Sequence, residues 1–464
     1  MSHVISGQDL IAAGLAPGRW FKPALAAANV ALDGGASFEE ALAIVRGFEP
    51  PPAVPLRSQA ATLHVNIEAE APEEIANVQS VLATMDAVLR TPVVTAGAIM
   101  PDACPAGPLG TIPVGGVVVS EAIHPGMHSA DICCSMTISV FPEASPAALL
   151  DAVHASTHFG PGGRPRGQQV RPSAELLERF VGNPFLSDLT SPAIEHFATQ
   201  GDGNHFAFVG QLKSTGETAL VTHHGSRAPG ARLYKKGMAV AEDFRKRLSP
   251  ETLPQNAWIP GDSAEGERYW EALQIVRAWT KASHEAIHDM AAERLGTRVG
   301  DRFWNEHNFV FRKSDGLFYH AKGATPAFAG WADDATDLTL IPLNMSQPVL
   351  IARGLDARHG LGFSPHGAGR NFSRTQHKRS LGDRTVEEVF ASETAGLDAR
   401  FFCGKADVSE LPSAYKDAAS VRRQIESFGL AEIVDEVVPY GSIMAGDWEQ
   451  DAPWRKKRSG RERK

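Results

Sequence analysis

The stretch GGVVVSEAIHPGMHSADICCSMTISVF, residues 115–141, contains two β-like runs with histidines and cysteines between them. Further short runs of this kind lie at 62–67, 219–224 and 348–352. Longer stretches with helical periodicity lie among them, at 73–89, 268–295 and 420–430. Because the two kinds of segment alternate without a regular β–α–β period, the sequence predicts an α+β domain and not a doubly wound sheet.

The N-terminal residues follow a different pattern. Apolar residues three or four positions apart predict helices at 7–15, 22–32 and 37–48, the third capped by Ser37. The segment FEPPPAVPL that follows cannot continue a helix. We therefore expect three parts, which are a helical module with its linker over 1–55, a main domain over 56–446 and a basic tail over 447–464.

The composition is that of a globular protein with a sizeable core, since 43% of the 464 residues are hydrophobic and 21% are charged. No apolar run reaches the ~18 residues of a membrane span, and the start MSHVISGQDL lacks the features of a signal peptide. We expect a cytoplasmic protein without membrane contact. Four cysteines are too few for a disulfide framework in a chain of this length and are interpreted as thiols or metal ligands.

The charge is distributed unevenly along the chain. Seven basic residues and one acid fall within 454–464, so the net charge of −9 leaves −15 on residues 1–453. A tail of this sign attracts polyanions such as nucleic acids, and a solvated end without a partner is an equally good interpretation.

Histidine and cysteine occur in patterns that suggest a metal site. Of the seventeen histidines, several lie in loops with Gly or Asn neighbours, and a DxxC unit occupies 131–134. Thiolate, carboxylate and imidazole together suit Mn, Zn, Co or Ni better than Mg or Ca. If the thiolate bridges two ions, the candidates supply three ligands to each and leave positions open for catalysis. These candidates are Asp131, Cys134, His205, His223 and His307.

The segment HGAGR at 366–370 has the composition of a phosphate-handling loop. His366 is a candidate nucleophile, Gly367 and Gly369 can turn N–H groups towards a phosphate, and Arg370 can pair with it. Lys322 is a second, weaker candidate for a phosphate contact. The alternative interpretation of the segment is a glycine-rich turn with an incidental histidine.

A competing motif, HEAIH at 284–288, has the HExxH spacing of zinc proteases on a predicted helix. It has no GxxH continuation. We interpret it as part of an exposed helix face, and the protease hypothesis predicts that Glu285→Gln abolishes peptide cleavage while Cys134→Ala does not.

Six segments, in this order, resemble the RtcB-type RNA ligases over roughly residues 95–446. They are PDACPAGPLGTIPVGGVVVSEAIHPGMHSADICCSM, GDGNHFAFVG, THHGSRAPG, EHNFV, KGATPAF and SPHGAGRNFSR. The resemblance implies a large mixed-sheet α+β domain that joins 3′-phosphate or 2′,3′-cyclic phosphate ends to 5′-hydroxyl ends. It also implies two Mn²⁺ ions, GTP, and RNA substrates such as tRNA halves or broken RNA ends. DNA ends are a further candidate substrate, and an archease-like activator is a candidate partner.

The resemblance also implies roles for individual residues. The two manganese ions would be held by the five ligands named above, with Cys134 bridging, and His366 would carry GMP. The implied nucleotide-binding positions are Asn204, Phe206, Phe208, Arg227, Asn308, Pro342, Leu343, Asn344, Met345, Gly367, Ala368, Gly369, Arg370 and Met444.

This chain departs from the family's pattern mostly where the guanine base would bind. Phe208 stands where the family usually has Glu, PLNM at 342–345 replaces PGSM, Val349 replaces Ser and Met444 replaces Lys. Ala321 for Arg and Cys104 for His are smaller departures. Without charged partners for a purine edge, we expect base selection to be weaker or different. The sequence therefore leaves two variants open, an end-capping paralogue with altered nucleotide choice and a metal-dependent 3′-end phosphatase or phosphodiesterase.

Overall fold

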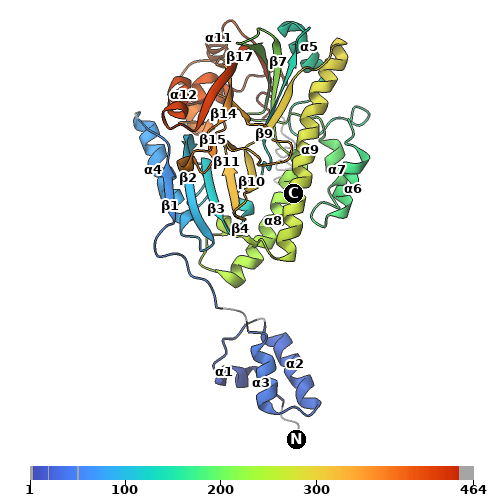
Figure 1. The fold of residues 1–464 in the computed structure, drawn as a ribbon, viewed down its shortest axis with the longest axis vertical. Helices are drawn as coiled ribbons and strands as arrows, with labels where there is room; N and C mark the ends of the chain where they lie inside the picture. The colour runs from blue at the N-terminus through green and yellow to red at the C-terminus, as the bar shows by residue number, and fades with distance from the viewer. Residues whose placement is uncertain (1–3, 19, 50–51, 70, 449–464) are drawn as a thin grey trace, which may run out of the picture. The chain divides into compact units, whose positions relative to one another are not determined.

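The computed structural model describes residues 4–18, 20–49, 52–69 and 71–448 (Figure 1). The chain divides into two compact units, one of residues 1–55 with 245–251 and one of residues 56–244 with 252–464. The basic tail expected at the C-terminus lies outside the described residues from position 449 onward.

The first unit contains the three helices that the sequence predicts, α1 (Gly7–Ala12), α2 (Phe21–Asp33) and α3 (Phe38–Arg46). Ser6 and Ser37 begin α1 and α3 with capping boxes, in which the serine accepts from the third backbone N–H and an acid three residues on accepts from the serine N–H. The buried side chains of this unit form a small core of their own, from Ile5, Leu10, Leu15, Ala24, Ala28, Ala41 and Val45.

The second unit is built on two large sheets within the described residues (Figure 1). A five-stranded sheet has the order β1 (Thr62–Val65), β2 (Val94–Cys104), β3 (Val114–Ser120), β11 (Phe318–Lys322), β10 (Asn308–Arg312). An eight-stranded sheet has the order β13 (Leu338–Pro342), β14 (Val349–Gly354), β17 (Ala431–Met444), β6 (Phe206–Leu212), β7 (Thr218–His224), β5 (Ser135–Phe141), β9 (Arg302–Glu306), with β16 (Asp398–Phe401) beside β17. Two short pairs join β4 (Ala122–Ile123) to β8 (Ile259–Pro260) and β12 (Ala324–Pro326) to β15 (Phe363–Pro365). Because β1–β2 and β16–β17 are parallel and the other pairs antiparallel, the sheets are mixed and the α+β prediction is confirmed.

The α-helices after the first 55 residues are α4 (Pro72–Leu89), α5 (Pro146–Ser156), α6 (Ala174–Gly182), α7 (Thr190–Glu195), α8 (Arg227–Leu248), α9 (Ala264–Leu295), α10 (Arg374–Ser380), α11 (Val386–Glu393) and α12 (Ala418–Ser427). Of these, α4, α5, α9 and α12 pack on the strands of the sheets. Short 3₁₀ turns are η1 (Pro125–Met127), η2 (Pro254–Asn256), η3 (Arg358–Gly360), η4 (Val408–Glu410) and η5 (Pro412–Ala414). Among the residues that the structure describes, none of these helices has the length and apolar character needed to cross a bilayer.

The eight-stranded sheet has two different faces where β5, β6 and β7 meet. Since successive side chains of a strand point to opposite faces, the paired residues Met136 and His223 share one face while Ser135 and His224 share the other. Buried side chains of the 32-residue helix α9 bond to the hydroxyl groups on the second face. The first face carries His223 into the cavity described next.

Candidate active site

The five candidate metal ligands lie at one end of four neighbouring strands, in the order β6-β7-β5-β9. Cys134 directly precedes β5 and His205 directly precedes β6, whereas His223 is near the end of β7 and His307 follows β9. These strands run antiparallel, so the start of one lies beside the end of the next. A backbone hydrogen bond of 2.9 Å from the His307 N–H to the Cys134 carbonyl joins the end of β9 to the start of β5. Asp131 lies in the turn before Cys134.

The ligand atoms of these residues converge in two groups that share one sulfur. Cys134 Sγ lies 3.2 Å from His223 Nε2 and 3.5 Å from His205 Nε2. His223 Nε2 is 3.1 Å from His307 Nε2, and His205 Nε2 is 3.1 Å from Asp131 Oδ2. In each of the groups Cys134–His223–His307 and Asp131–Cys134–His205, the atoms all lie within 4.8 Å of one another. The geometry therefore offers a pair of adjacent three-ligand sites around one thiol.

The chemistry of these groups fits divalent transition cations. Burial lowers the pKa of His223 and His307 well below the usual value, so both imidazoles are neutral and able to coordinate. His223 Nδ1 lies 3.1 Å from the Asn204 carbonyl, which fixes its proton there and leaves Nε2 with a lone pair. Burial raises the pKa of the Cys134 thiol well above its usual value, a cost that a bound cation would offset by stabilising the thiolate.

Two glycines make room for charged groups at this site. A Cβ on Gly225 would collide with the Asp131 carboxylate, and a Cβ on Gly201, where φ is +95°, would collide with the Arg227 guanidinium. Arg227 is itself in the left-handed region, with φ of +54°. The close approach of backbone and side chain therefore requires glycine at both positions.

His366, at the end of β15, faces the same cluster. Its ring centroid is 4.8 Å from that of His307. Its Nδ1 lies 2.8 Å from Oδ2 of Asp102, a fully buried carboxylate on β2. The carboxylate accepts from Nδ1–H, and in the neutral imidazole this arrangement places the lone pair on Nε2. The structure thus presents a nucleophilic nitrogen beside the candidate metal ligands.

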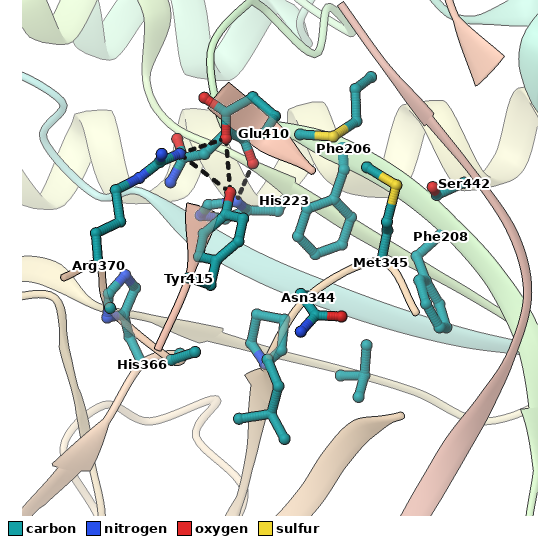
Figure 2. A pocket seen from close by; sticks show the side chains of 18 of the residues that line it. Phe206, Phe208, His223, Asn344, Met345, His366, Arg370, Glu410, Tyr415 and Ser442 are labelled. Atoms are coloured by element: carbon teal, nitrogen blue, oxygen red, sulfur yellow. Dashed lines mark hydrogen bonds and ion pairs between the residues drawn. The ribbon is translucent and has the colours of Figure 1, made fainter. Parts of the chain in front are cut away.

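A cavity opens beside His366 and His223 (Figure 2). Its empty space, including the open mouth, is about 870 Å³. Most of the nucleotide-binding positions expected from the sequence line it, namely Asn204, Phe206, Phe208, Pro342, Leu343, Asn344, Met345, Gly367, Ala368, Gly369, Arg370 and Met444. Figure 2 shows two distinct sides, with His366 and Arg370 on one and Phe206, Phe208, Met345 and Ser442 on the other.

Arg370, expected to contact phosphate, is held by protein groups. Its guanidinium donates to Glu410 Oε2 at 2.6 Å, to the Ser409 carbonyl at 2.5 Å and to Tyr415 Oη at 3.3 Å, and it stacks over the Tyr415 ring. Tyr415 Oη also donates to Glu410 at 2.6 Å. Arg370 therefore lines the cavity, but several of its N–H groups already donate to Ser409, Glu410 and Tyr415.

Three other expected phosphate contacts lie off the cavity lining. Arg227 is half-buried near Asp131, and burial lowers its pKa. Asn308 accepts the Gly323 N–H at 2.7 Å and supports that turn. Lys322 donates to the Ile112 carbonyl at 3.2 Å, and burial lowers its pKa to about 8. Their roles towards phosphate stay predictions.

The expectation that the HExxH motif lies on an exposed helix face is wrong. His284 and His288 of α9 are both buried. Both bond to Thr222 Oγ1, at 2.7 and 2.8 Å, and His284 also stacks on His224 with 3.5 Å between ring centroids. Neither belongs to a candidate metal group among the described residues. The imidazoles satisfy hydroxyl groups of the sheet, which explains why two histidines one turn apart point inward.

Four residues of the site are absent from the sequence-based predictions, namely Asp102, Glu410, Tyr415 and Ser442. An acid within the otherwise apolar run 94–104 was the available signal for Asp102, because a buried carboxylate needs a specific partner.

Comparisons with known proteins agree with this geometry. A family model described as tRNA-splicing ligase RtcB matches residues 184–445, more than half of the chain. The chain is 25% identical over 409 residues to the tRNA-splicing ligase RtcB of Aeropyrum pernix, covering 71% of this chain and 84% of that protein. It is 27% identical to the protein of the same name from Thermococcus kodakarensis, covering 61% and 64% respectively, so the match spans just under two thirds of that relative. It is 26% identical to the RNA-splicing ligase RtcB of Escherichia coli K12, covering 66% and 81%.

Proposed function

The chain belongs to the RtcB family and is an RNA ligase, and we propose that it joins 3′-phosphate or 2′,3′-cyclic phosphate ends to 5′-hydroxyl ends through a nucleotide carried on His366. The observation that carries this proposal is the orientation of His366, whose Nδ1 is bonded to Asp102 while its ring lies 4.8 Å from His307. A free Nε2 lone pair beside a cluster of cation ligands suits attack on a phosphate.

In the proposed first step, His366 Nε2 attacks the α-phosphorus of a nucleoside triphosphate. A nitrogen–phosphorus bond forms, the bond to the β-phosphate oxygen breaks and pyrophosphate leaves. Asp102 holds the Nδ1 proton throughout and stabilises the positive charge that develops on the ring. GTP is the nucleotide that the resemblance implies.

The two ligand groups around Cys134 support a pair of divalent transition ions, for which Mn²⁺ is the choice that the resemblance implies. When bound, such ions would offset the charge that develops on phosphate oxygens. The protein's own part is to hold three imidazoles, one carboxylate and one thiol in that arrangement, with Asn204 fixing the tautomer of His223.

The nucleotide would then pass from His366 to an RNA 3′-phosphate, and the 5′-hydroxyl of the second strand would displace the nucleoside monophosphate as the new phosphodiester forms. RNA ends, including tRNA halves, are the proposed substrates. DNA ends and an archease-like activator belong to the same proposal as a further substrate and a partner.

A labelling experiment tests the proposed nucleotide transfer. Full-length protein loaded with Mn²⁺ is incubated separately with each α-labelled nucleoside triphosphate, and the expected product is an acid-labile, base-stable label on His366. His366→Ala should abolish it, while His64→Ala, a half-buried histidine of β1 that does not line the cavity, should keep it. Release of phosphate from 3′-phosphate ends without nucleotide, unchanged in His366→Ala, would favour a phosphatase or phosphodiesterase instead.

A further inference from the structure

The cavity beside His366 has an apolar side whose position is set by strand register. Phe206 of β6 pairs with His223 of β7 on one side and with Met444 of β17 on the other, so these residues lie in a row across the sheet. Neighbouring strands are ~4.8 Å apart, which places the apolar side chains one and two strands away from a candidate metal ligand. A nucleotide with its phosphates at the ligand cluster therefore directs its base to this apolar side.

Polar groups are scarce on that side of the cavity. The lining residues there include Phe206, Phe208, Leu343, Met345, Val349 and Met444, and Ser442 supplies a hydroxyl. Of the described residues that line the cavity, Glu410 alone is acidic. Its carboxylate already accepts from Arg370 and Tyr415 and pairs with Arg374. The only acid of the described lining is therefore already held by two arginines and a tyrosine.

Asn344 presents a donor and not an acceptor to the cavity. Its Oδ1 accepts from the Ser346 N–H at 3.0 Å and from the Ser346 hydroxyl at 2.9 Å. Because the backbone N–H can only donate, the oxygen of the amide must face it, and the NH₂ group is left for a ligand. This donor can serve N1 of adenine or the carbonyl oxygen of guanine. Guanine then leaves both its ring N–H and its amino group without an acceptor from Asn344, whereas adenine leaves only its amino group.

We propose that the site takes an adenine nucleotide in preference to a guanine nucleotide, an inference that rests on the proposed transfer to His366. Guanine would bring a ring N–H and an amino group to a surface with few acceptors, and each buried polar group without a partner lowers affinity. Adenine brings fewer such groups and gains the same contact with the aromatic rings and methionines. On this proposal, the residues that depart from the family's pattern, around positions 208 and 342–349, form a base-binding site that prefers adenine.

The experiment compares ATP with GTP in two independent assays. The first measures the initial rate of His366 labelling in Mn²⁺-loaded full-length protein, and we expect ATP to be at least tenfold faster than GTP at equal subsaturating concentration. The second measures AMP and GMP binding to metal-loaded His366→Ala protein by equilibrium dialysis, with AMP at least tenfold tighter. If no triphosphate labels His366, the proposed function fails, and the dialysis still decides base preference. GMP binding as tightly as AMP, or no binding of either at millimolar concentration, overturns the inference.

An isosteric variant tests the role of Asn344. Asn344→Asp keeps an oxygen for Ser346 and replaces the donor by an acceptor, so the ratio of ATP to GTP labelling should fall at least tenfold. Gln347→Glu makes the same amide-to-acid change in the same turn at an exposed residue off the cavity and should leave the ratio unchanged. An unchanged ratio in Asn344→Asp, with both variants folded by circular dichroism, overturns the assignment of Asn344 as the residue that selects the base.

Discussion

The two adjacent cysteines have different surroundings although they share a sequence context. Cys134 directs its sulfur to the imidazoles of His205 and His223. Cys133, with φ of +56°, packs in the main hydrophobic core. Its N–H donates to the Asn308 carbonyl at 2.7 Å. The left-handed backbone at Cys133 thus turns one thiol into the core and the next into the site.

We predict that Cys134→Ala removes the ligand shared by both metal groups. Manganese content, measured by atomic emission on dialysed protein, should fall from two ions per chain to less than one, and the labelling rate should fall by about 100-fold. Cys133→Ala is the matched control, because it should keep both ions and lose only stability through the small cavity it leaves. Equal metal content in the two variants would contradict the shared-ligand arrangement.

We predict that Asp102→Asn slows labelling of His366 on the order of 100-fold, because a neutral amide neither fixes the Nδ1 proton nor stabilises a positive ring. The measurements are the labelling rate at saturating nucleotide and the KM for nucleotide, and the KM should change less than twofold. A KM that rises as much as the rate falls would indicate a structural role for Asp102 in shaping the cavity.

At the scale of single residues, the sequence predicts the site residues whose side-chain type and neighbours are chemically distinctive. Cysteine and histidine flanked by glycine or asparagine stand out, and the structure brings Cys134, His205, His223 and His307 together with Asp131. Asp102 and Glu410 do not stand out, because each acts by holding another side chain, and such partners are defined only by the folded chain.

At the scale of elements, helix α9 shows why a motif alone is a weak guide. His284 and His288 fit both a zinc-binding helix and a helix whose imidazoles bond to the hydroxyls of Thr222, Ser135 and Ser139. Spacing along the helix is the same in both cases. The difference lies in the strands that pack against it, and the sequence of α9 does not contain that information.

We predict that the motif on α9 has a structural role only. Glu285→Gln should leave the free energy of unfolding within about 0.5 kcal/mol of the wild-type value. His288→Ala should lower it by about 2 kcal/mol, because Ser139 and Thr222 lose a buried partner. Urea unfolding followed by circular dichroism measures both. Loss of bound metal or of labelling in Glu285→Gln would contradict this assignment.

A second prediction concerns the buried histidines at β4 and η1. Burial lowers the pKa of His124 and of His128 from 6.5 to about 4. Between pH 6.5 and 4 the unfolded chain therefore binds protons that the folded chain does not, so stability falls as pH falls through this window. Each histidine contributes a slope of up to about 1.4 kcal/mol per pH unit.

The test is urea unfolding of the wild-type chain at pH 7, 6 and 5, compared with His124→Gln. Removing this titrating group should reduce the loss between pH 6 and pH 5 by about 1 kcal/mol. The same pH dependence in the variant would show that His124 does not bind the extra proton on unfolding. His64→Gln serves as a control for replacing a histidine that is only half-buried.

At the scale of the whole molecule, the sequence predicts the class of fold and most of its elements. The β-like runs correspond to β1, β3, β5, β7 and β14, and the helical stretches to α4, α9 and α12. Strand order was not predictable. The strand β17 pairs with β14 and also with β6, which lies more than 200 residues earlier in the chain. Local sequence patterns do not encode pairing between strands so far apart.

We predict that removing residues 1–55 leaves nucleotide transfer to His366 within about twofold of the full-length rate. Every residue that lines the cavity lies between positions 104 and 444, and the N-terminal helices form a core of their own. The measurement is the labelling rate of the two chains at equal manganese loading, with thermal unfolding to confirm folding. A large fall in rate with an unchanged melting temperature would assign the N-terminal helices a part in the reaction.

The distribution of the ligands along the chain has a consequence for biosynthesis. Four strands of the eight-stranded sheet, β5, β6, β7 and β9, lie between Asp131 and His307 in the sequence, and the other four, β13, β14, β16 and β17, follow His307. A growing polypeptide on the ribosome cannot assemble both ion sites until His307 has emerged. A cation that needs His307 as a ligand would therefore bind only after synthesis has passed residue 307 of the 464.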